Sequence, residues 1–284
     1  MKMCIGVIGA GVMGSGVAQT FAQSGYETIL IDISRDQLET AKKKIRENLR
    51  FQRLFKKSKI DENTDDIMER ICFTLSYDKL KKADFIVENV TEDWDIKKGV
   101  YKKMMQECKE DCIFGVNTSA ISITRVGSVC KKPENVIGIH FMNPVPLKDT
   151  VEVIKGVHTS DKTIMKVKEL LHEIGKKGIV INDSVGFVTN RAMMIFVNEA
   201  AFILQEGVAS AQEIDTLFIN CFGHKMGPLH TADLIGVDTI LKSLEVLYEG
   251  YNDSKYRPCP LLKKMTDAGL TGMKCGKGFY DYSV

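Results

Sequence analysis

The sequence lacks the features that direct a chain to a membrane, to secretion or to a nucleic acid. Its 284 residues contain no apolar run long enough to cross a bilayer. The N-terminus leads almost directly into a short apolar segment, without the longer apolar stretch and cleavage site of a secretory signal. The 39 basic and 37 acidic side chains give a net charge of +2, and no long lysine run suggests a nucleic-acid-binding tail. We therefore expect a cytoplasmic protein that binds neither membranes nor nucleic acid.

Paired metal-binding cysteines are also missing. The chain has eight cysteines, but none forms a Cys-x-x-Cys pair, and Cys108 and Cys112 have no histidine nearby. We therefore predict no metal site, and scattered single thiols are typical of a reducing compartment. The length of 284 residues is enough for one large domain or two ordinary ones, and the 44% of hydrophobic residues provide material for a core.

A glycine-rich turn follows the first predicted strand. Residues 4–8 form a continuous apolar run, as expected for a strand buried on both faces, and apolar residues at helical spacing come after the turn. Gly9 lets the chain turn sharply, Gly11 lets a pyrophosphate approach the main chain, and Gly14 lets the helix pack close to the strand. The free N–H groups of the helix N-terminus favour phosphate binding. The pattern predicts a dinucleotide site.

An acid indicates which dinucleotide binds. Asp32 follows the second predicted strand, residues 27–31, about eighteen residues after Gly14. An acid at this place hydrogen-bonds the ribose hydroxyls of NAD and repels the extra phosphate of NADP. Arg35 lies nearby and would suit NADP, but the acid favours NAD. The alternative is a glycine turn that serves only packing.

The remaining pattern predicts two domains. Residues 37–68 read as a helical excursion broken near Ser58 and Asp61. After Asp183 and Ser184 the pattern changes to helices, beginning with a long apolar helix at 187–206. We expect an α/β sheet domain in residues 1–184 and an all-helical domain in residues 185–284. Further strands are predicted at 71–73, 84–88, 112–116, 136–140, 150–154 and 178–181, with helices near 97–108 and 162–174.

His140 stands at the end of a predicted strand and is followed by Asn143 and two prolines that rigidify the loop. In a doubly wound sheet, the carboxyl end of a strand faces the crevice where ligands bind. On the next strand, Glu152 alternates with the apolar Val151 and Val153 and so faces the opposite side from them. A carboxylate on one imidazole nitrogen raises the basicity of the other. The pattern predicts a proton-abstracting base, and a structural or solvated histidine is the alternative.

Other polar residues are expected near the same crevice. Thr118 and Ser119 follow a buried strand, where a hydroxyl could bind a reacting oxygen or could cap the helix expected from about Ile123. A functional role is favoured for Ser119. Asn190, near the start of the long apolar helix, could face the cleft between the domains or make a capping or interhelical hydrogen bond.

A set of motifs extends over essentially the whole chain. They are GAGVMGSGVAQ, VENVTED, NTSAISIT, HFMNPVP with VEV, GFVTNR, MGPL, GVD and GKGFYDYS. As a set they resemble the short-chain L-3-hydroxyacyl-CoA dehydrogenase family, which includes the bacterial 3-hydroxybutyryl-CoA dehydrogenases.

The resemblance implies a Rossmann-type, doubly wound, mostly parallel sheet, followed by a helical domain that forms a homodimer. It implies NAD-dependent interconversion of a 3-hydroxyacyl thioester and the 3-ketoacyl thioester. In this chain His140 would be the general base and Glu152 its partner. The groups around the substrate hydroxyl and the nicotinamide would be Ser119, Asn143 and Asn190. The further NAD contacts would be Asp32, Glu92, Lys97, Asn143 and Lys274.

The group that carries the acyl chain could be coenzyme A or an acyl carrier protein. Asn48 and Phe55 stand where some family members place a serine and a lysine on coenzyme A. Other members act on a short hydroxyacyl unit attached to an acyl carrier protein in polyketide-type biosynthesis. Lys56, Lys57 and Lys59 could meet a coenzyme A phosphate or an acidic carrier protein, or could form a solvated helix face. A free hydroxyacid dehydrogenase and a non-catalytic NAD-binding protein are the remaining alternatives.

Overall fold

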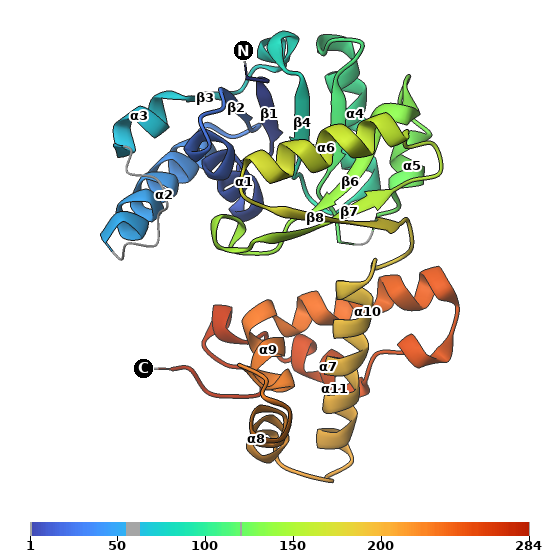
Figure 1. Cartoon of the computed structure of the whole chain (residues 1–284). Helices are drawn as coiled ribbons and strands as arrows, with labels where there is room; N and C mark the ends of the chain where they lie inside the picture. Colours follow the sequence, from blue (N-terminus) through green and yellow to red (C-terminus); the bar gives the residue numbers. More distant parts are fainter. Residues whose placement is uncertain (1, 55–62, 120, 284) are drawn as a thin grey trace. The chain divides into compact units, whose positions relative to one another are not determined.

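The computed structural model describes residues 2–54, 63–119 and 121–283. The chain divides into two compact units, one ending at Asp183 and the other beginning at Ser184 (Figure 1). This division lies next to the position at which the sequence pattern changes. Each unit has its own core, so each is described by itself.

The first unit is built on an eight-stranded sheet in the order β3-β2-β1-β4-β5-β6-β7-β8. Neighbouring strands from β3 to β6 are parallel, β6 and β7 are antiparallel, and β7 and β8 are again parallel. The expected mostly parallel sheet is therefore confirmed. The strands are β1 Ile5–Ile8, β2 Thr28–Ile31, β3 Ile71–Thr74, β4 Phe85–Glu88, β5 Ile113–Val116, β6 Val136–His140, β7 Thr150–Lys155 and β8 Lys177–Asn182.

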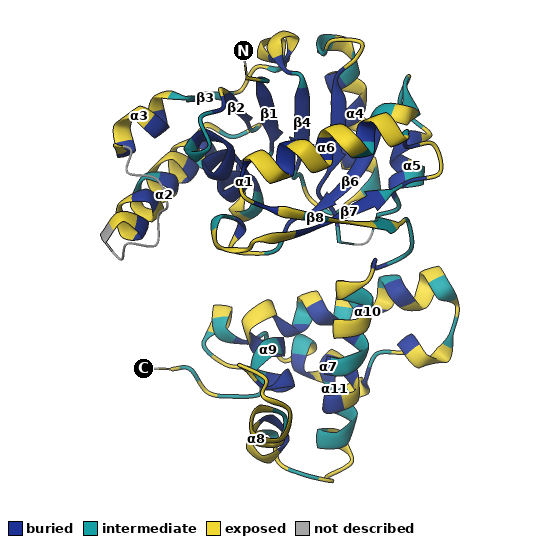
Figure 2. Cartoon of the chain, viewed as in Figure 1, coloured by how far each residue is buried: buried dark blue, intermediate teal, exposed yellow. Residues whose placement is uncertain are grey.

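Helices cover both faces of the sheet, which is why its central strands are apolar without alternation. On one face, residues of α1, α2, α3 and α6 share a core with Val7, Val87 and Val153. On the other, Tyr101 of α4 packs edge-on against Phe114 of β5. Figure 2 shows β1 and β4 as buried strands between these layers. The helices are α1 Val12–Gln23, α2 Arg35–Leu54, α3 Thr64–Glu69, α4 Trp94–Glu107, α5 Ile123–Gly127 and α6 Asp161–Glu173.

The helical excursion is present as α2 and α3, which together follow β2. Its expected break near Ser58 and Asp61 lies outside the described residues, as do Phe55, Lys56, Lys57 and Lys59. Asn48, on α2, is exposed. Helix α4 begins three residues earlier than predicted, because Asp93 accepts a hydrogen bond from the Ile96 N–H and caps it.

The second unit is all-helical, as expected. Helix α7 begins at Thr189 rather than 187, because Gly186 and Phe187 both have positive φ angles and so cannot continue an α-helix. The core of the second unit contains buried apolar residues from α7, α9, α10 and α11. The helices are α7 Thr189–Gln205, α8 Ala211–Phe222, α9 Pro228–Ile235, α10 Val237–Tyr251 and α11 Pro260–Asp267.

Two buried carboxylates organise the C-terminal motifs. Asp215 of α8 accepts hydrogen bonds from the main-chain N–H groups of Leu229 and His230 and so caps α9. Asp233 of α9 accepts from the main-chain N–H groups of Phe279 and Tyr280, which binds the closing segment to the helices. The MGPL motif, which contains Leu229, and the closing GKGFYDYS motif therefore both have a structural explanation within the second unit.

Three further observations concern the part of the chain that the structure describes. None of the described helices has the length and apolar character needed to cross a membrane. The eight cysteines are free thiols. Among residues 2–54, 63–119 and 121–283, no cluster of three or more histidine, cysteine or acidic side chains is arranged to hold a metal ion.

Candidate active site

The glycine turn between β1 and α1 has the geometry that a dinucleotide requires. Gly9 has a φ of +91°, and a Cβ there would lie 2.7 Å from the Asn89 carbonyl oxygen. A Cβ on Gly14 would lie 1.7 Å from the Gly9 carbonyl oxygen, so only glycine allows this packing of α1. Gly11, by contrast, has open space within 4 Å of its Cβ position. The turn thus leaves room for a pyrophosphate at the helix N-terminus, and these residues fit an NAD site.

Asp32 lies beside this turn, directly after β2. Its Oδ2 accepts a hydrogen bond from the Ala10 N–H at 2.7 Å, and its Oδ1 accepts from the Ser34 N–H at 3.0 Å. The carboxylate is thus held at the carboxyl edge of the sheet, on the same side as the glycine turn. This is the place from which an acid can reach the ribose of a bound NAD.

His140 and Glu152 face each other across the antiparallel strands β6 and β7. The imidazole Nδ1 lies 2.7 Å from the Glu152 Oε2, and both residues are buried. The predicted contact between this carboxylate and this imidazole is confirmed. When Nδ1 carries the proton and makes a hydrogen bond to Glu152, Nε2 keeps a lone pair and can accept a proton.

Ser119 contacts the other side of the same ring, with its Oγ 3.2 Å from the His140 Nε2. The main-chain N–H of Ser119 donates to the Glu92 Oε1 at 3.0 Å, and the Thr118 hydroxyl donates to the same oxygen. The alternative that Thr118 or Ser119 caps the following helix is wrong. Ser122 caps α5, and its side chain accepts from the Arg125 N–H.

Lys97 forms a buried ion pair that sequence reasoning missed. Its Nζ lies 2.8 Å from the Glu88 Oε1 and 3.6 Å from the Glu92 Oε2, and the side chains of Lys97 and Glu88 are both 0% exposed. Burial raises the pKa of the Glu88 carboxyl, and the adjacent ammonium opposes this shift. The structure therefore places Lys97 beneath Glu92, inside the protein. Its assignment to NAD stays a prediction.

Asn117 and Asn89 are further residues that sequence reasoning missed. The Asn117 Oδ1 accepts from the Phe141 N–H at 3.3 Å, and its Nδ2 donates to the Asn89 Oδ1 at 2.7 Å. The pair joins the ends of β4 and β5 to the residue that follows His140. The available signal was the position of each asparagine directly after a buried strand.

Three further expected site residues lie in the loop after β6 and in the second unit. Asn143 is exposed in the loop after β6. Asn190 is half-buried near the start of α7, in the second unit. Lys274, also in the second unit, pairs with Asp238 at 2.5 Å. Their roles toward substrate and cofactor stay predictions.

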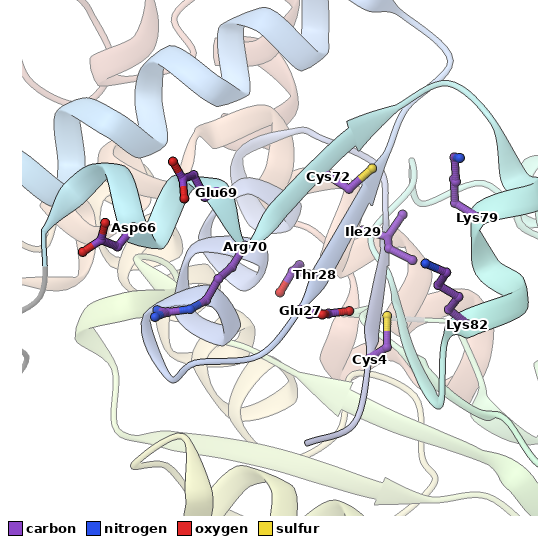
Figure 3. Close-up of a pocket in the computed structure, with 10 residues that line it drawn as sticks. All are labelled: Cys4, Glu27, Thr28, Ile29, Asp66, Glu69, Arg70, Cys72, Lys79 and Lys82. Carbon is purple, nitrogen blue, oxygen red and sulfur yellow. The ribbon is translucent and has the colours of Figure 1, made fainter. Parts of the chain in front are cut away.

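A cavity of about 710 Å³ lies at the opposite edge of the sheet (Figure 3). It is formed where β1, β2 and β3 begin, whereas Asp32 and His140 stand where strands end. Its charged lining residues are balanced in sign, and in Figure 3 they spread apart rather than converge, so they favour no particular ligand. These charged residues are Glu27, Asp66, Glu69, Arg70, Lys79 and Lys82.

Comparison with known proteins gives matches over both units. The NAD binding domain of 3-hydroxyacyl-CoA dehydrogenase matches residues 4–184, and the C-terminal domain of the same family matches residues 186–282. A probable 3-hydroxybutyryl-CoA dehydrogenase of Deinococcus radiodurans is 43% identical over 280 residues, covering 99% of this chain and all of that protein. A 3-hydroxybutyryl-CoA dehydrogenase of Bradyrhizobium diazoefficiens is 41% identical, covering 98% of this chain and 94% of the relative.

Solved structures agree with these matches. The crystal structure of (S)-3-hydroxybutyryl-CoA dehydrogenase from Ralstonia eutropha has a TM-score of 0.94 at 40% identity and covers the whole of both chains. FadB2 of M. tuberculosis has a TM-score of 0.96 at 29% identity and covers 99% of each chain. Since the two family domains account for nearly all residues, the chain belongs to the 3-hydroxyacyl-CoA dehydrogenase family of NAD-dependent oxidoreductases.

Proposed function

We propose that this chain catalyses the reversible, NAD-dependent oxidation of a short 3-hydroxyacyl-CoA, with 3-hydroxybutyryl-CoA as the expected substrate. The observation that carries the proposal is the chain of contacts from Ser119 through His140 to Glu152, at the edge of the sheet that also bears Asp32. The names of the relatives, 3-hydroxybutyryl-CoA dehydrogenases at about 40% identity, support the same substrate.

In the direction of oxidation, the His140 Nε2 takes the proton of the 3-hydroxyl group. The electron pair of the O–H bond forms the new carbonyl bond as the hydrogen on carbon 3 leaves with its own electron pair. NAD, when bound, accepts that hydride. The Glu152 carboxylate stabilises the imidazolium that forms, because the two groups are in contact and shielded from water.

The other site residues hold the substrate for this transfer. The Ser119 hydroxyl is within hydrogen-bonding distance of the His140 Nε2, so a substrate oxygen that bonds to one can bond to both. Glu92 fixes the Ser119 main chain. We assign Asn143 and Asn190 to the substrate and nicotinamide, and Lys274 to NAD, on the family resemblance.

The test is a substrate comparison in the direction of reduction, followed through the absorbance of NADH. We expect the purified chain to reduce acetoacetyl-CoA with NADH faster than with NADPH, and to leave free acetoacetate unchanged. A carrier-protein thioester is expected to react more slowly than acetoacetyl-CoA. Faster reaction with the carrier-bound substrate would assign the chain to the carrier protein instead, and no turnover of either thioester would refute the proposal.

We propose that the second unit also forms a homodimer. Helix α8 exposes large apolar side chains, among them Phe222 at 71% and Leu217 at 55% exposure, which a single copy leaves in water. Light scattering on the purified chain is expected to give twice the mass of 31.8 kDa. A monomer at micromolar concentration would contradict this.

A further inference from the structure

The loop between β6 and β7 has to be fixed from outside. The two strands pair only from Gly138 with Ile154 to His140 with Glu152, so the ladder ends at the catalytic pair itself. The loop that follows includes the exposed Asn143 and a short 3-10 helix, η3 Val145–Leu147. Within the loop the Leu147 N–H donates to the Pro144 carbonyl oxygen at 3.0 Å, and contacts to η3 from other elements help to fix the position of Asn143.

Lys176 provides one of these contacts. Its Nζ donates to the Val145 and Lys148 carbonyl oxygens, each at 2.7 Å, and so joins both ends of η3. The residue is only 6% exposed. Its own main chain is fixed where α6 ends, since its N–H donates to the Leu171 carbonyl oxygen at 2.8 Å. The ammonium thus connects the loop to a rigid part of the sheet domain.

The 3-10 helix η3 also packs on α1. Val145 is 2% exposed, and a Cβ on Gly16 of α1 would lie 3.1 Å from the Val145 Cβ and 3.5 Å from the Pro146 Cδ. Helix α1 is the element whose N-terminus carries the glycine turn. The segment is therefore held by two contacts, one with α1 and one with Lys176.

Burying an ammonium group costs desolvation free energy, which a contact that serves only packing does not require. Burial lowers the pKa of Lys176, and the Asp149 carboxylate opposes this shift. The two main-chain carbonyls offset the burial through charge-assisted hydrogen bonds, which are stronger than neutral ones. An apolar side chain of similar length would fill the same space, but would leave both carbonyls without this donor.

We propose that Lys176 is a positioning residue of the dehydrogenase: it fixes η3 against α1 and so holds Asn143 and the end of β6 in register with the bound cofactor. The inference rests on the proposed function. A displacement of about 1 Å at a reacting group can cost on the order of 10²-fold in rate, so loss of the Lys176 contacts to η3 is expected to lower kcat.

The test compares Lys176→Met with Lys177→Met. Lys177 is adjacent and exposed, and its contribution to the loop is a main-chain N–H bond to the Asp149 carbonyl oxygen, which the substitution retains. Both variants lose one charge. We expect Lys176→Met to lower kcat at saturating substrates by roughly 10- to 100-fold at a temperature where the protein is fully folded. We expect Lys177→Met to stay within about twofold of the wild type, and Lys176→Arg, which keeps donors, to recover part of the loss.

Circular dichroism at the assay temperature separates misfolding from misplacement. If Lys176→Met does not fold, Val145→Ala decides, because it loosens the same segment from α1 without touching the ammonium. A folded Val145→Ala with kcat/KM at least fivefold below the wild type supports the inference. Wild-type kinetics in folded Lys176→Met, or in Val145→Ala, would overturn it. An inactive wild type would instead refute the proposed function.

Discussion

Ser119 and Glu152 contact opposite nitrogens of one imidazole ring. The Ser119 Oγ lies 3.2 Å from the His140 Nε2, and the Glu152 Oε2 lies 2.7 Å from its Nδ1. Ser119 lies in the loop that follows β5, and Glu152 lies on β7; these two strands flank β6 in the sheet. The two contacts thereby fix the orientation of the ring.

Replacing His140 by glutamine is expected to remove the base while retaining a polar side chain of similar size. General-base catalysis contributes about 10²- to 10⁴-fold, so kcat should fall by at least the lower figure. NADH binding, measured by fluorescence titration, should change by less than about threefold, since the glycine turn and Asp32 are untouched. His172→Gln, at an exposed site on α6, is the control. Turnover within a few-fold of the wild type would remove His140 from the mechanism.

Asp32 is expected to set the preference for NAD. In Asp32→Ser the side chain no longer repels the 2′-phosphate of NADP, and the bond to the ribose weakens. The ratio of kcat/KM for NADH to that for NADPH should therefore fall by at least tenfold, mainly through KM for NADH. Steady-state assays with both cofactors measure this ratio. An unchanged ratio would mean that another residue discriminates between the two.

Lys97→Met is expected to destabilise the first unit strongly. It leaves the Glu88 carboxylate buried without its ammonium, and breaking such a pair typically costs about 3–5 kcal/mol. Urea unfolding measures the free energy of unfolding. The double variant Glu88→Gln with Lys97→Met should recover part of the loss, because no charge is then left buried. If the single variant were as stable as the wild type, the pair would not be as dry as the structure indicates.

Asp84, which lies away from the active site, is expected to make the stability of the fold depend on pH. Burial raises its pKa, but the hydrogen bonds from Lys109 and from the Cys4 N–H outweigh this, so the pKa is lowered overall. A depressed carboxyl pKa stabilises the fold above the unfolded-state pKa, and this contribution is lost as pH falls through the folded-state pKa. Because the pair is more than a third exposed, solvent screening keeps the effect to about 0.5 kcal/mol.

We therefore expect Asp84→Asn to be about 0.5 kcal/mol less stable than the wild type at pH 7, with the difference shrinking as pH falls below about 4. Urea unfolding across this range measures it. Lys109→Met should give a similar loss at pH 7, and the double variant should show that the two losses do not add. A difference that grows toward low pH would contradict the sign of the shift.

The parts of the fold that depend on local patterns could be predicted from the sequence. Continuous apolar runs gave the buried strands, and the glycine spacing gave the turn before α1. The contact between His140 and Glu152 was also predictable, because one residue ends a strand and the other alternates with valines on the next. Helix ends were less predictable, since they depend on caps such as Asp93 and on the positive φ of Phe187.

Long-range polar contacts could not be predicted. A lysine in a charged segment such as that of Lys97 reads as solvated, and only the fold shows that its ammonium meets Glu88 inside the protein. The same holds for Lys176, whose partners are main-chain carbonyls that carry no sequence signal. Lys274 was identified as an NAD contact through the family resemblance alone, whereas Asn190 was also indicated by its position near the start of the long apolar helix.

The pairing of His140 with Glu152 across two short strands limits how this gene can change. Inserting or deleting a single codon within β6 or β7 would turn one of the two side chains to the other face of the sheet and separate the acid from the base. The connecting loop has no alternation of faces to preserve, so it tolerates a change of length wherever Asn143 and η3 keep their positions. Viable length variation among descendants of this chain should therefore accumulate in the loop and be absent from the two strands.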